Sequence, residues 1–267
     1  MTKATQRQAK GYDSDVDAFD VPAAIVCAHC GKPECPGCAG FGLKSSGVIA
    51  IVPWERPHGN AWSRMLTTAK VTTQNAELFF SSMPDGEISA AIAFAFFAEL
   101  LAVLSMLLVL FSGFLTLFPG YVFELARDEL TRRAFLGWLA VGVPGLTTWV
   151  IAAHAMHGAA LNHGAQQQGA ANQSKRALRF GLYACGWDVM NGPIGLAATF
   201  MSSGVVSTLG LVADALRVPN AASMALLTGV YRLTNEQARR ARRVGTLIVA
   251  IFTGVTALLV LMLLWIS

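Results

Sequence analysis

Residues 88–118 read ISAAIAFAFFAELLAVLSMLLVLFSGFLTLF, an apolar run of 31 residues that contains one charged side chain, Glu99. A helix of about 20 apolar residues is enough to cross the hydrocarbon core of a bilayer. The run is therefore predicted to form one long or tilted membrane-spanning helix rather than two spans joined by a turn.

The composition of the whole chain agrees with a bilayer setting. Of its 267 residues, 54% are hydrophobic and 13% are charged, whereas soluble domains carry about 25% charged residues. This scarcity of charge excludes a water-covered globule of this size. The sequence also contains no nucleotide-binding glycine loop and no Gly-x-Ser-x-Gly elbow, and its net charge of +4 reflects loop topology. We expect an all-α polytopic membrane protein that binds no nucleic acid.

Further apolar runs predict four more spans, which gives five in total. The second span is expected over residues 134–160 and the last over residues 244–266. Between them lies a 40-residue apolar stretch, 177–216, which is interrupted by the polar and helix-breaking residues 191–193. Two short spans divided somewhere between residues 196 and 203 would fit this stretch.

The distribution of basic residues predicts the orientation, because Lys and Arg in short loops mark the cytoplasmic side. Eight of them lie in the first 87 residues, and others are concentrated in segments 161–179 and 217–243. Five spans place all three regions on one side. The loop 119–133 adds three arginines on the other side, where three acidic residues neutralise them. We expect a multi-pass integral membrane protein with a cytoplasmic N-terminus and the C-terminus on the opposite side.

The chain before the first span divides into three predicted parts. Residues 1–24 lack apolar periodicity and are expected to be disordered, residues 25–47 hold a cysteine cluster, and residues 48–87 form a linker and a helix. Apolar residues recur at helical spacing between Trp62 and Phe80. This pattern fits a helix in the membrane interface or a helix packed on the membrane domain. The membrane domain itself is assigned to residues 88–267.

Four of the five cysteines, Cys27, Cys30, Cys35 and Cys38, lie in the stretch CAHCGKPECPGC. Each Cys-x-x-Cys pair can form a turn that directs two thiolates at one ion, and Zn²⁺ takes four such ligands in a tetrahedron. We predict a zinc knuckle with structural Zn²⁺, because four thiolates leave no open coordination position. The pattern resembles the short knuckles, related to half of a B-box zinc finger, that precede membrane domains in some bacterial proteins and usually serve binding.

The spacing of the cysteines leaves alternatives open. Only four residues separate the two pairs, where zinc ribbons leave about 15–20. One ion in a compact knuckle fits this spacing, and so do two half-sites completed by His29 or His58. A dithiol redox pair and disulfides are the competing interpretations, of which disulfides are disfavoured in a reducing cytoplasm.

Ionisable side chains within spans cost about 2.5–3.5 kcal/mol on insertion scales and indicate a function or a buried partner. Glu99, Asp188 and Asp214 are the candidates of this kind. Glu99 is expected to act in a proton relay or to be a protonated or hydrogen-bonded packing residue. Asp188 lies close to the break at 191–193, where freed backbone groups can share its hydrogen bonds.

Three histidines, His154, His157 and His163, lie near the inner end of the second predicted span. His154 and His157 are three residues apart and share a helix face, which is compatible with a metal site. Membrane di-iron oxygenases use more histidines on several helices, so the favoured interpretation is histidines that face lipid headgroups. The fifth cysteine, Cys185, is expected to be an apolar packing residue.

Several short motifs resemble the bacterial branch of the Yip family. They are PWE at 53–55, the spacing from Trp62 to Thr68, the Phe79-Phe80 pair before the first span, the stretch from Tyr183 to Pro193, and GVYRLTNEQARRA at 229–241. The resemblance covers roughly residues 50–267. It implies a Rab-interacting type of five-span membrane protein with a cytoplasmic N-terminus, which organises or recruits partners without catalysis.

These features lead to three functional hypotheses. The leading one is a non-enzymatic membrane scaffold or adaptor, whose cytoplasmic zinc-binding tail recruits a protein partner. Its spans contact the lipid bilayer and can self-associate into a homo-oligomer. The alternative is a small transporter or channel that uses Glu99 and the broken third span, because discontinuous helices line substrate sites. The third is a membrane metalloenzyme built on the histidine group.

Overall fold

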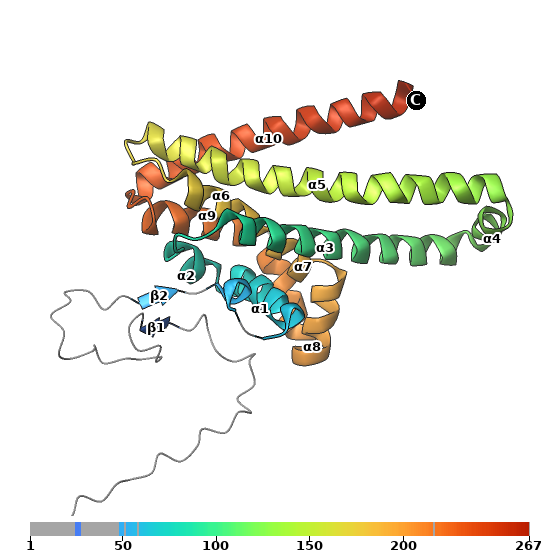
Figure 1. Cartoon of the computed structure of the whole chain (residues 1–267), viewed down its shortest axis with the longest axis horizontal. Helices are drawn as coiled ribbons and strands as arrows, with labels where there is room; N and C mark the ends of the chain where they lie inside the picture. The colour runs from blue at the N-terminus through green and yellow to red at the C-terminus, as the bar shows by residue number, and fades with distance from the viewer. Residues whose placement is uncertain (1–24, 28–47, 51, 58, 216, 267) are drawn as a thin grey trace, which may run out of the picture.

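The computed structural model describes residues 25–27, 48–50, 52–57, 59–215 and 217–266 (Figure 1). This part of the chain is almost entirely helical, as predicted. Its two short strands, β1 (Ile25–Cys27) and β2 (Val48–Ala50), pair antiparallel. The tail predicted to be disordered, residues 1–24, lies outside the described residues.

A 3-10 helix, η1 (Pro53–Glu55), leads into the helical part. The α-helices that follow are α1 (Ala61–Gln74), α2 (Ala76–Ser81), α3 (Ile88–Leu117), α4 (Pro119–Arg127), α5 (Glu129–Gln167), α6 (Ser174–Ala184), α7 (Gly186–Asn191), α8 (Pro193–Ala215), α9 (Val218–Gly229) and α10 (Asn235–Ile266). The long helices α3, α5 and α10 extend in one direction, with α4 at the turn between α3 and α5 (Figure 1). The C-terminal end of α10 is directed toward the α4 end (Figure 1).

Four helices of the described chain are long and apolar enough to span a membrane, namely α3, α5, α8 and α10. The prediction of five spans is therefore wrong in one place, the stretch 177–216. The first part of this stretch forms α6 and α7, in which Phe180, Tyr183 and Trp187 are at most 4% exposed. These residues are apolar because they belong to a protein core, which hydropathy alone does not distinguish from lipid contact.

The helix α8 is broken at Gly204, where φ is 77° and ψ is −176°. Each half has 11 residues and is about 16 Å long. The hydrocarbon core of a bilayer is about 30 Å thick, so neither half alone is long enough to cross it. The sequence predicts a division between residues 196 and 203, and the break lies one residue beyond this interval. The predicted interruption at 191–193 is present, since α7 ends at Asn191 and Gly192 is extended.

Lipid-type surface and protein core occupy different parts of the molecule. Apolar side chains are exposed along the far parts of the long helices, with Leu117 at 73%, Val141 at 75% and Leu258 at 62%. At the other end, η1, α1, α2, α6, α7 and α9 surround one core, and we call these elements the base. Ala69 of α1 and Phe80 of α2 are fully buried there. The helical segment after the tail is therefore packed on the membrane helices, which is the second of the two alternatives given above.

Glycines allow α5 and α6 to touch along their backbones. A Cβ atom at Gly158 of α5 would lie 1.9 Å from the Ala177 carbonyl oxygen, and one at Gly181 of α6 would lie 2.1 Å from the His154 carbonyl oxygen. Small residues on both helices are what such close crossings require. This contact fixes α5 against α6 and so determines where His154 lies.

A substitution pair in α5 tests this contact. We expect Gly158→Ala to lower the free energy of unfolding by roughly 1–3 kcal/mol, the usual cost of overpacking. Gly142→Ala is the matched control, because a Cβ there meets no atom within 4 Å and alanine favours a helix by about 1 kcal/mol over glycine. The measurement is the thermal unfolding midpoint of the detergent-solubilised protein. Equal midpoints for the two variants would contradict the close crossing.

Candidate functional site

The PWE motif forms η1 and joins the N-terminal segment to the membrane helices. The Trp54 indole N–H donates a hydrogen bond to the Ala90 carbonyl at the start of α3 (2.8 Å). The Trp54 backbone N–H donates to Thr68 Oγ1 in α1, also at 2.8 Å. The Trp54 ring packs against Phe94, with 6.0 Å between the ring centroids. Trp54 therefore links η1, α1 and α3.

Glu55 of the same motif makes an ion pair with a buried arginine of the base. Its carboxylate accepts hydrogen bonds from Arg179 and Tyr183, which both lie on α6. Arg179 and Tyr183 are 0% exposed, and Arg179 Nη1 also donates to the Pro84 carbonyl at 2.6 Å. Burial and the Glu55 carboxylate raise the pKa of Tyr183, so its hydroxyl stays protonated and remains a donor. We call these four residues the anchor site.

The residues beside Pro84 complete this arrangement. A Cβ at Gly86 would lie 2.3 Å from Arg179 Nη1, so only glycine leaves room for the guanidinium. One turn earlier on α6, Arg176 donates two hydrogen bonds to the Asp85 carboxylate, at 2.7 and 2.6 Å. The hydrogen bonds from Arg176 hold the pKa of Asp85 below its usual range. The loop between α2 and α3 is thus bound to α6 by two arginines.

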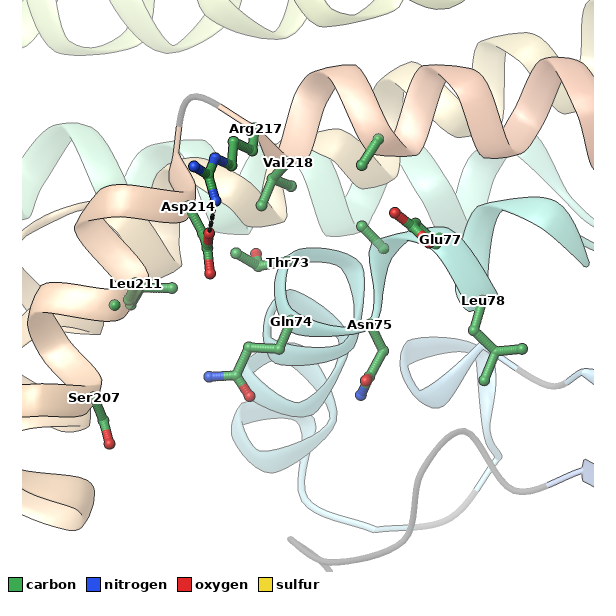
Figure 2. A pocket seen from close by; sticks show the side chains of 13 residues that line it. Thr73, Gln74, Asn75, Glu77, Leu78, Ser207, Leu211, Asp214, Arg217 and Val218 are labelled. Atoms are coloured by element: carbon green, nitrogen blue, oxygen red, sulfur yellow. Dashed lines mark ion pairs between the residues drawn. The ribbon is translucent and has the colours of Figure 1, made fainter. Parts of the chain in front are cut away.

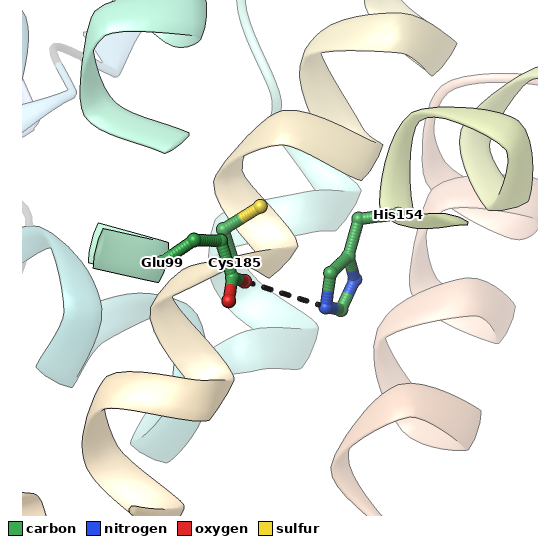
Figure 3. A group of neighbouring side chains, drawn as sticks. All are labelled: Glu99, His154 and Cys185. Atoms are coloured by element: carbon green, nitrogen blue, oxygen red, sulfur yellow. Dashed lines mark ion pairs between the residues drawn. The ribbon is translucent and has the colours of Figure 1, made fainter. Parts of the chain in front are cut away.

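A second group of polar side chains meets in the space between neighbouring helices (Figure 3). Glu99 comes from α3, His154 from α5, and Cys185 from the junction of α6 and α7. One potential ligand atom from each of these residues lies within 4.8 Å of the others. His154 Nε2 is 3.7 Å from Glu99 Oε1 and 2.9 Å from Oδ2 of Asp188, which α7 contributes. We call these four residues the core cluster.

The core cluster is shielded from solvent on most sides. Glu99 is 1% exposed and Cys185 is 0% exposed, while the His154 ring packs edge-on against Trp187. Burial raises the pKa of the Cys185 thiol well above its usual range. Asp188 is the most accessible member, with a side chain that is 41% exposed. Within the described residues, neither Glu99 nor Asp188 pairs with a lysine or an arginine.

Asp214, the third predicted intramembrane acid, lies apart from the core cluster. It is exposed near the end of α8, with Oδ1 at 3.7 Å from Arg217 Nη1. Both residues line a cleft of about 650 Å³ between α1, α2, α8 and α9 (Figure 2). Gln74 of α1 and Asn75, which joins α1 to α2, contribute polar side chains to the opposite wall.

The three histidines of the predicted second metal site have different partners. His154 belongs to the core cluster, His157 faces Ser223 Oγ of α9 at 3.3 Å, and the exposed His163 contacts Gln167 at 3.0 Å. In the part of the chain that the structure describes, only His154 joins a group with metal-ligand geometry. The structure therefore combines His154 with residues of other helices rather than with its neighbours in sequence.

The predicted zinc ligands Cys30, Cys35 and Cys38 lie outside the described residues. Cys27 ends β1, and it pairs in register with Val48 of β2. The strand pair thus brings together the two ends of the segment that holds the other three cysteines. The zinc knuckle itself stays a prediction.

Sequence reasoning missed the roles of Arg179, Tyr183 and Cys185. Arg179 counts in the sequence as a loop charge that sets topology, and its partner Glu55 lies 124 positions earlier. Cys185 lies 86 positions after Glu99. The one usable signal is Glu55 itself, an acidic residue at the end of the PWE motif, but a single sequence does not indicate its partner.

Comparisons of the chain with protein-family models, with curated proteins and with solved structures gave no match. The PWE motif and the Phe79-Phe80 pair that the sequence analysis singles out have definite structural positions. Trp54 and Glu55 hold η1 to α3 and α6, and Phe79 and Phe80 pack edge-to-face in the core of the base. In this protein these motif residues build the base of the membrane domain.

Two arginines that are one turn apart on α6 test the anchor site. We expect Arg179→Met to lower the free energy of unfolding by about 3–5 kcal/mol, because it leaves the Glu55 carboxylate, whose side chain is only 21% exposed, without its charged partner. Arg176→Met, which removes an exposed pair with Asp85, should cost no more than about 1 kcal/mol. Tryptophan fluorescence during thermal unfolding in detergent measures the stability of both variants relative to the unmodified protein. Equal losses in the two variants would contradict a special role for the buried pair.

Proposed function

We propose that the protein is a non-enzymatic integral membrane scaffold or adaptor, whose cytoplasmic zinc-binding tail recruits a protein partner. The observation that carries this proposal is the anchor site. It binds the segment directly after the tail to α6 through a fully buried guanidinium. A tail that only tethered a flexible domain would need no such contact. In this proposal the tail is displayed from a fixed position at the base.

The paired strands support a compact recognition module at this position. β2 ends at Ala50, three residues before η1 begins, and β1 lies beside β2 in antiparallel register. The segment between them holds Cys30, Cys35 and Cys38, while Cys27 closes β1. Zinc bound by these thiolates would fold a segment that is too short to form a core of its own.

A basic surface lies at the same end of the molecule as the base. Arg239, Arg240 and Arg243 are exposed on the first turns of α10, and α10 begins beside α9 (Figure 1). Arginines at the end of a membrane helix attract anionic headgroups of the cytoplasmic leaflet. This surface would orient the base at the membrane and present the tail to the cytoplasm, with the basic residues forming part of the docking surface.

Photo-crosslinking of the full chain in living cells tests the proposal. A crosslinking amino acid at Lys44, inside the predicted knuckle, should give a discrete protein adduct. The same group at Leu258, an exposed apolar position far along α10, is the matched control and should not give that adduct. Because zinc folds the knuckle, Cys30→Ser and a membrane-permeant zinc chelator should each reduce the Lys44 adduct at least fivefold. An adduct that persists in Cys30→Ser, or that also forms from Leu258, would contradict zinc-dependent recruitment.

A second candidate is a small membrane transporter or channel. The core cluster favours it, because ionisable residues buried among membrane helices mark ion and proton pathways. The breaks at Gly192 and Gly204 favour it too, since discontinuous helices line substrate sites. Glu99→Gln separates the two candidates. Loss of solute flux in reconstituted vesicles with an unchanged Lys44 adduct would favour transport over recruitment.

A further inference from the structure

We propose that the core cluster is a binding site for a divalent transition metal ion of the zinc type, with Glu99, His154, Cys185 and Asp188 as its ligands. These residues come from α3, α5, the α6–α7 junction and α7, so the ion would join helices that are distant in sequence. The site is distinct from the predicted zinc knuckle and does not depend on the recruitment of a partner by the tail.

Small side-chain movements would bring the ligand atoms of the core cluster to the distances of a tetrahedral site. Zinc holds nitrogen and oxygen ligands at about 2.0–2.2 Å and sulfur at about 2.3 Å, which separates neighbouring ligand atoms by roughly 3.3–3.7 Å. His154 Nε2 and Glu99 Oε1 are 3.7 Å apart, and Nε2 and Asp188 Oδ2 are 2.9 Å apart. Cys185 Sγ lies within 4.8 Å of the Glu99 and His154 ligand atoms. Side-chain rotations that bring the sulfur closer by roughly 1 Å would complete the coordination.

One buried ligand atom of the core cluster lacks a hydrogen-bond partner among the described residues. Glu99 is 1% exposed, and its Oε1 has no hydrogen-bond partner among the described residues. The carboxylate nevertheless points toward the His154 ring (Figure 3). Cys185 Sγ lies 4.0 Å from the Gly181 carbonyl oxygen and also faces the Glu99 carboxylate. A buried polar atom without a partner is costly, and a metal ion would give Glu99 Oε1 the partner that it lacks.

The charge of the core cluster also favours a cation. Two carboxyl groups and a thiol face one imidazole, and no lysine or arginine of the described chain pairs with them. Buried charges are stable in proteins when they are paired or coordinate a metal. A bound divalent ion supplies the missing positive charge, and the Cys185 thiol proton leaves to solvent as the sulfur coordinates.

The mixture of ligand types indicates the class of ion. Ca²⁺ takes six to eight oxygen ligands, and Mg²⁺ needs an octahedron of oxygens. Sulfur and imidazole ligands exclude both as the preferred occupants. Zn²⁺ accepts cysteine, histidine and carboxylate ligands in one tetrahedral site. Co²⁺ has the same charge, is bound by the same kinds of ligand and absorbs visible light, which makes it a suitable probe.

The experiment uses the full chain without a polyhistidine tag, purified in detergent. Its background variant carries Cys27→Ser, Cys30→Ser, Cys35→Ser and Cys38→Ser, so that the predicted knuckle binds no metal. Titration with Co²⁺ should reach one ion per chain and produce the visible bands of tetrahedral Co²⁺ together with a sulfur-to-cobalt charge-transfer band. Zn²⁺ should displace Co²⁺ and abolish both signals.

Substitutions then assign the ligands. Cys185→Ser should remove the charge-transfer band, and Glu99→Gln and His154→Gln should each weaken Co²⁺ binding at least tenfold. Glu77→Gln and His163→Gln, which change exposed residues of the same types, are the matched controls and should leave the titration unchanged. Circular dichroism checks that each variant is folded, and Cys185→Ala provides a second test of the sulfur if the serine variant does not fold.

The proposal is overturned if the background variant binds no Co²⁺ or shows no charge-transfer band. It is also overturned if folded Cys185→Ser and Glu99→Gln variants bind like the background protein. Both results concern a protein without knuckle cysteines, so they are independent of the Lys44 crosslinking result. Failure of the metal site and failure of the recruitment proposal are therefore distinguishable.

Discussion

The buried pair of Arg179 and Glu55 is the interaction on which the rest of the structure depends. Removing two such charges from water costs several kcal/mol per ion, and the protein recovers this cost only with good geometry and further hydrogen bonds. Tyr183 and the Pro84 carbonyl supply those bonds, and Gly86 leaves the space. The pair requires α6 to lie within protein rather than lipid, and it holds η1 and the loop before α3 against α6. The base, and with it the starting point of the tail, follows from this constraint.

The sequence predicts the lipid-facing helices well, because their apolar runs have the length that a bilayer demands. The run 88–118 corresponds to α3, and the predicted spans 134–160 and 244–266 lie within α5 and α10. The same reasoning gives a wrong prediction for the stretch 177–216. Its first part is equally apolar, but it is buried by other helices, and periodicity does not separate these two environments. Gly204 breaks the remaining part through a positive φ that other residues rarely adopt.

The candidate site could be predicted only in fragments. Glu99 and Asp188 stand out in the sequence because charge is costly in an apolar setting. Their common position beside His154 depends on the crossing of α5 over α6, which glycines permit. Cys185 carries no signal of its own, since an isolated cysteine among apolar residues resembles core packing. Residues that meet from three separate helices leave no pattern of spacing along one chain.

Hydrogen exchange of the full chain in lipid nanodiscs tests the central claim most directly, by comparing the unmodified protein with Glu55→Gln. The account predicts that amides of α1 (61–74) exchange at least tenfold faster in Glu55→Gln, while amides of α10 are unchanged, because the N-terminal segment loses its attachment to α6. Glu77→Gln, which alters an exposed glutamate of α2, should leave both helices unchanged. Unaltered exchange of α1 in Glu55→Gln would show that the ion pair of Glu55 and Arg179 does not hold the N-terminal segment to α6.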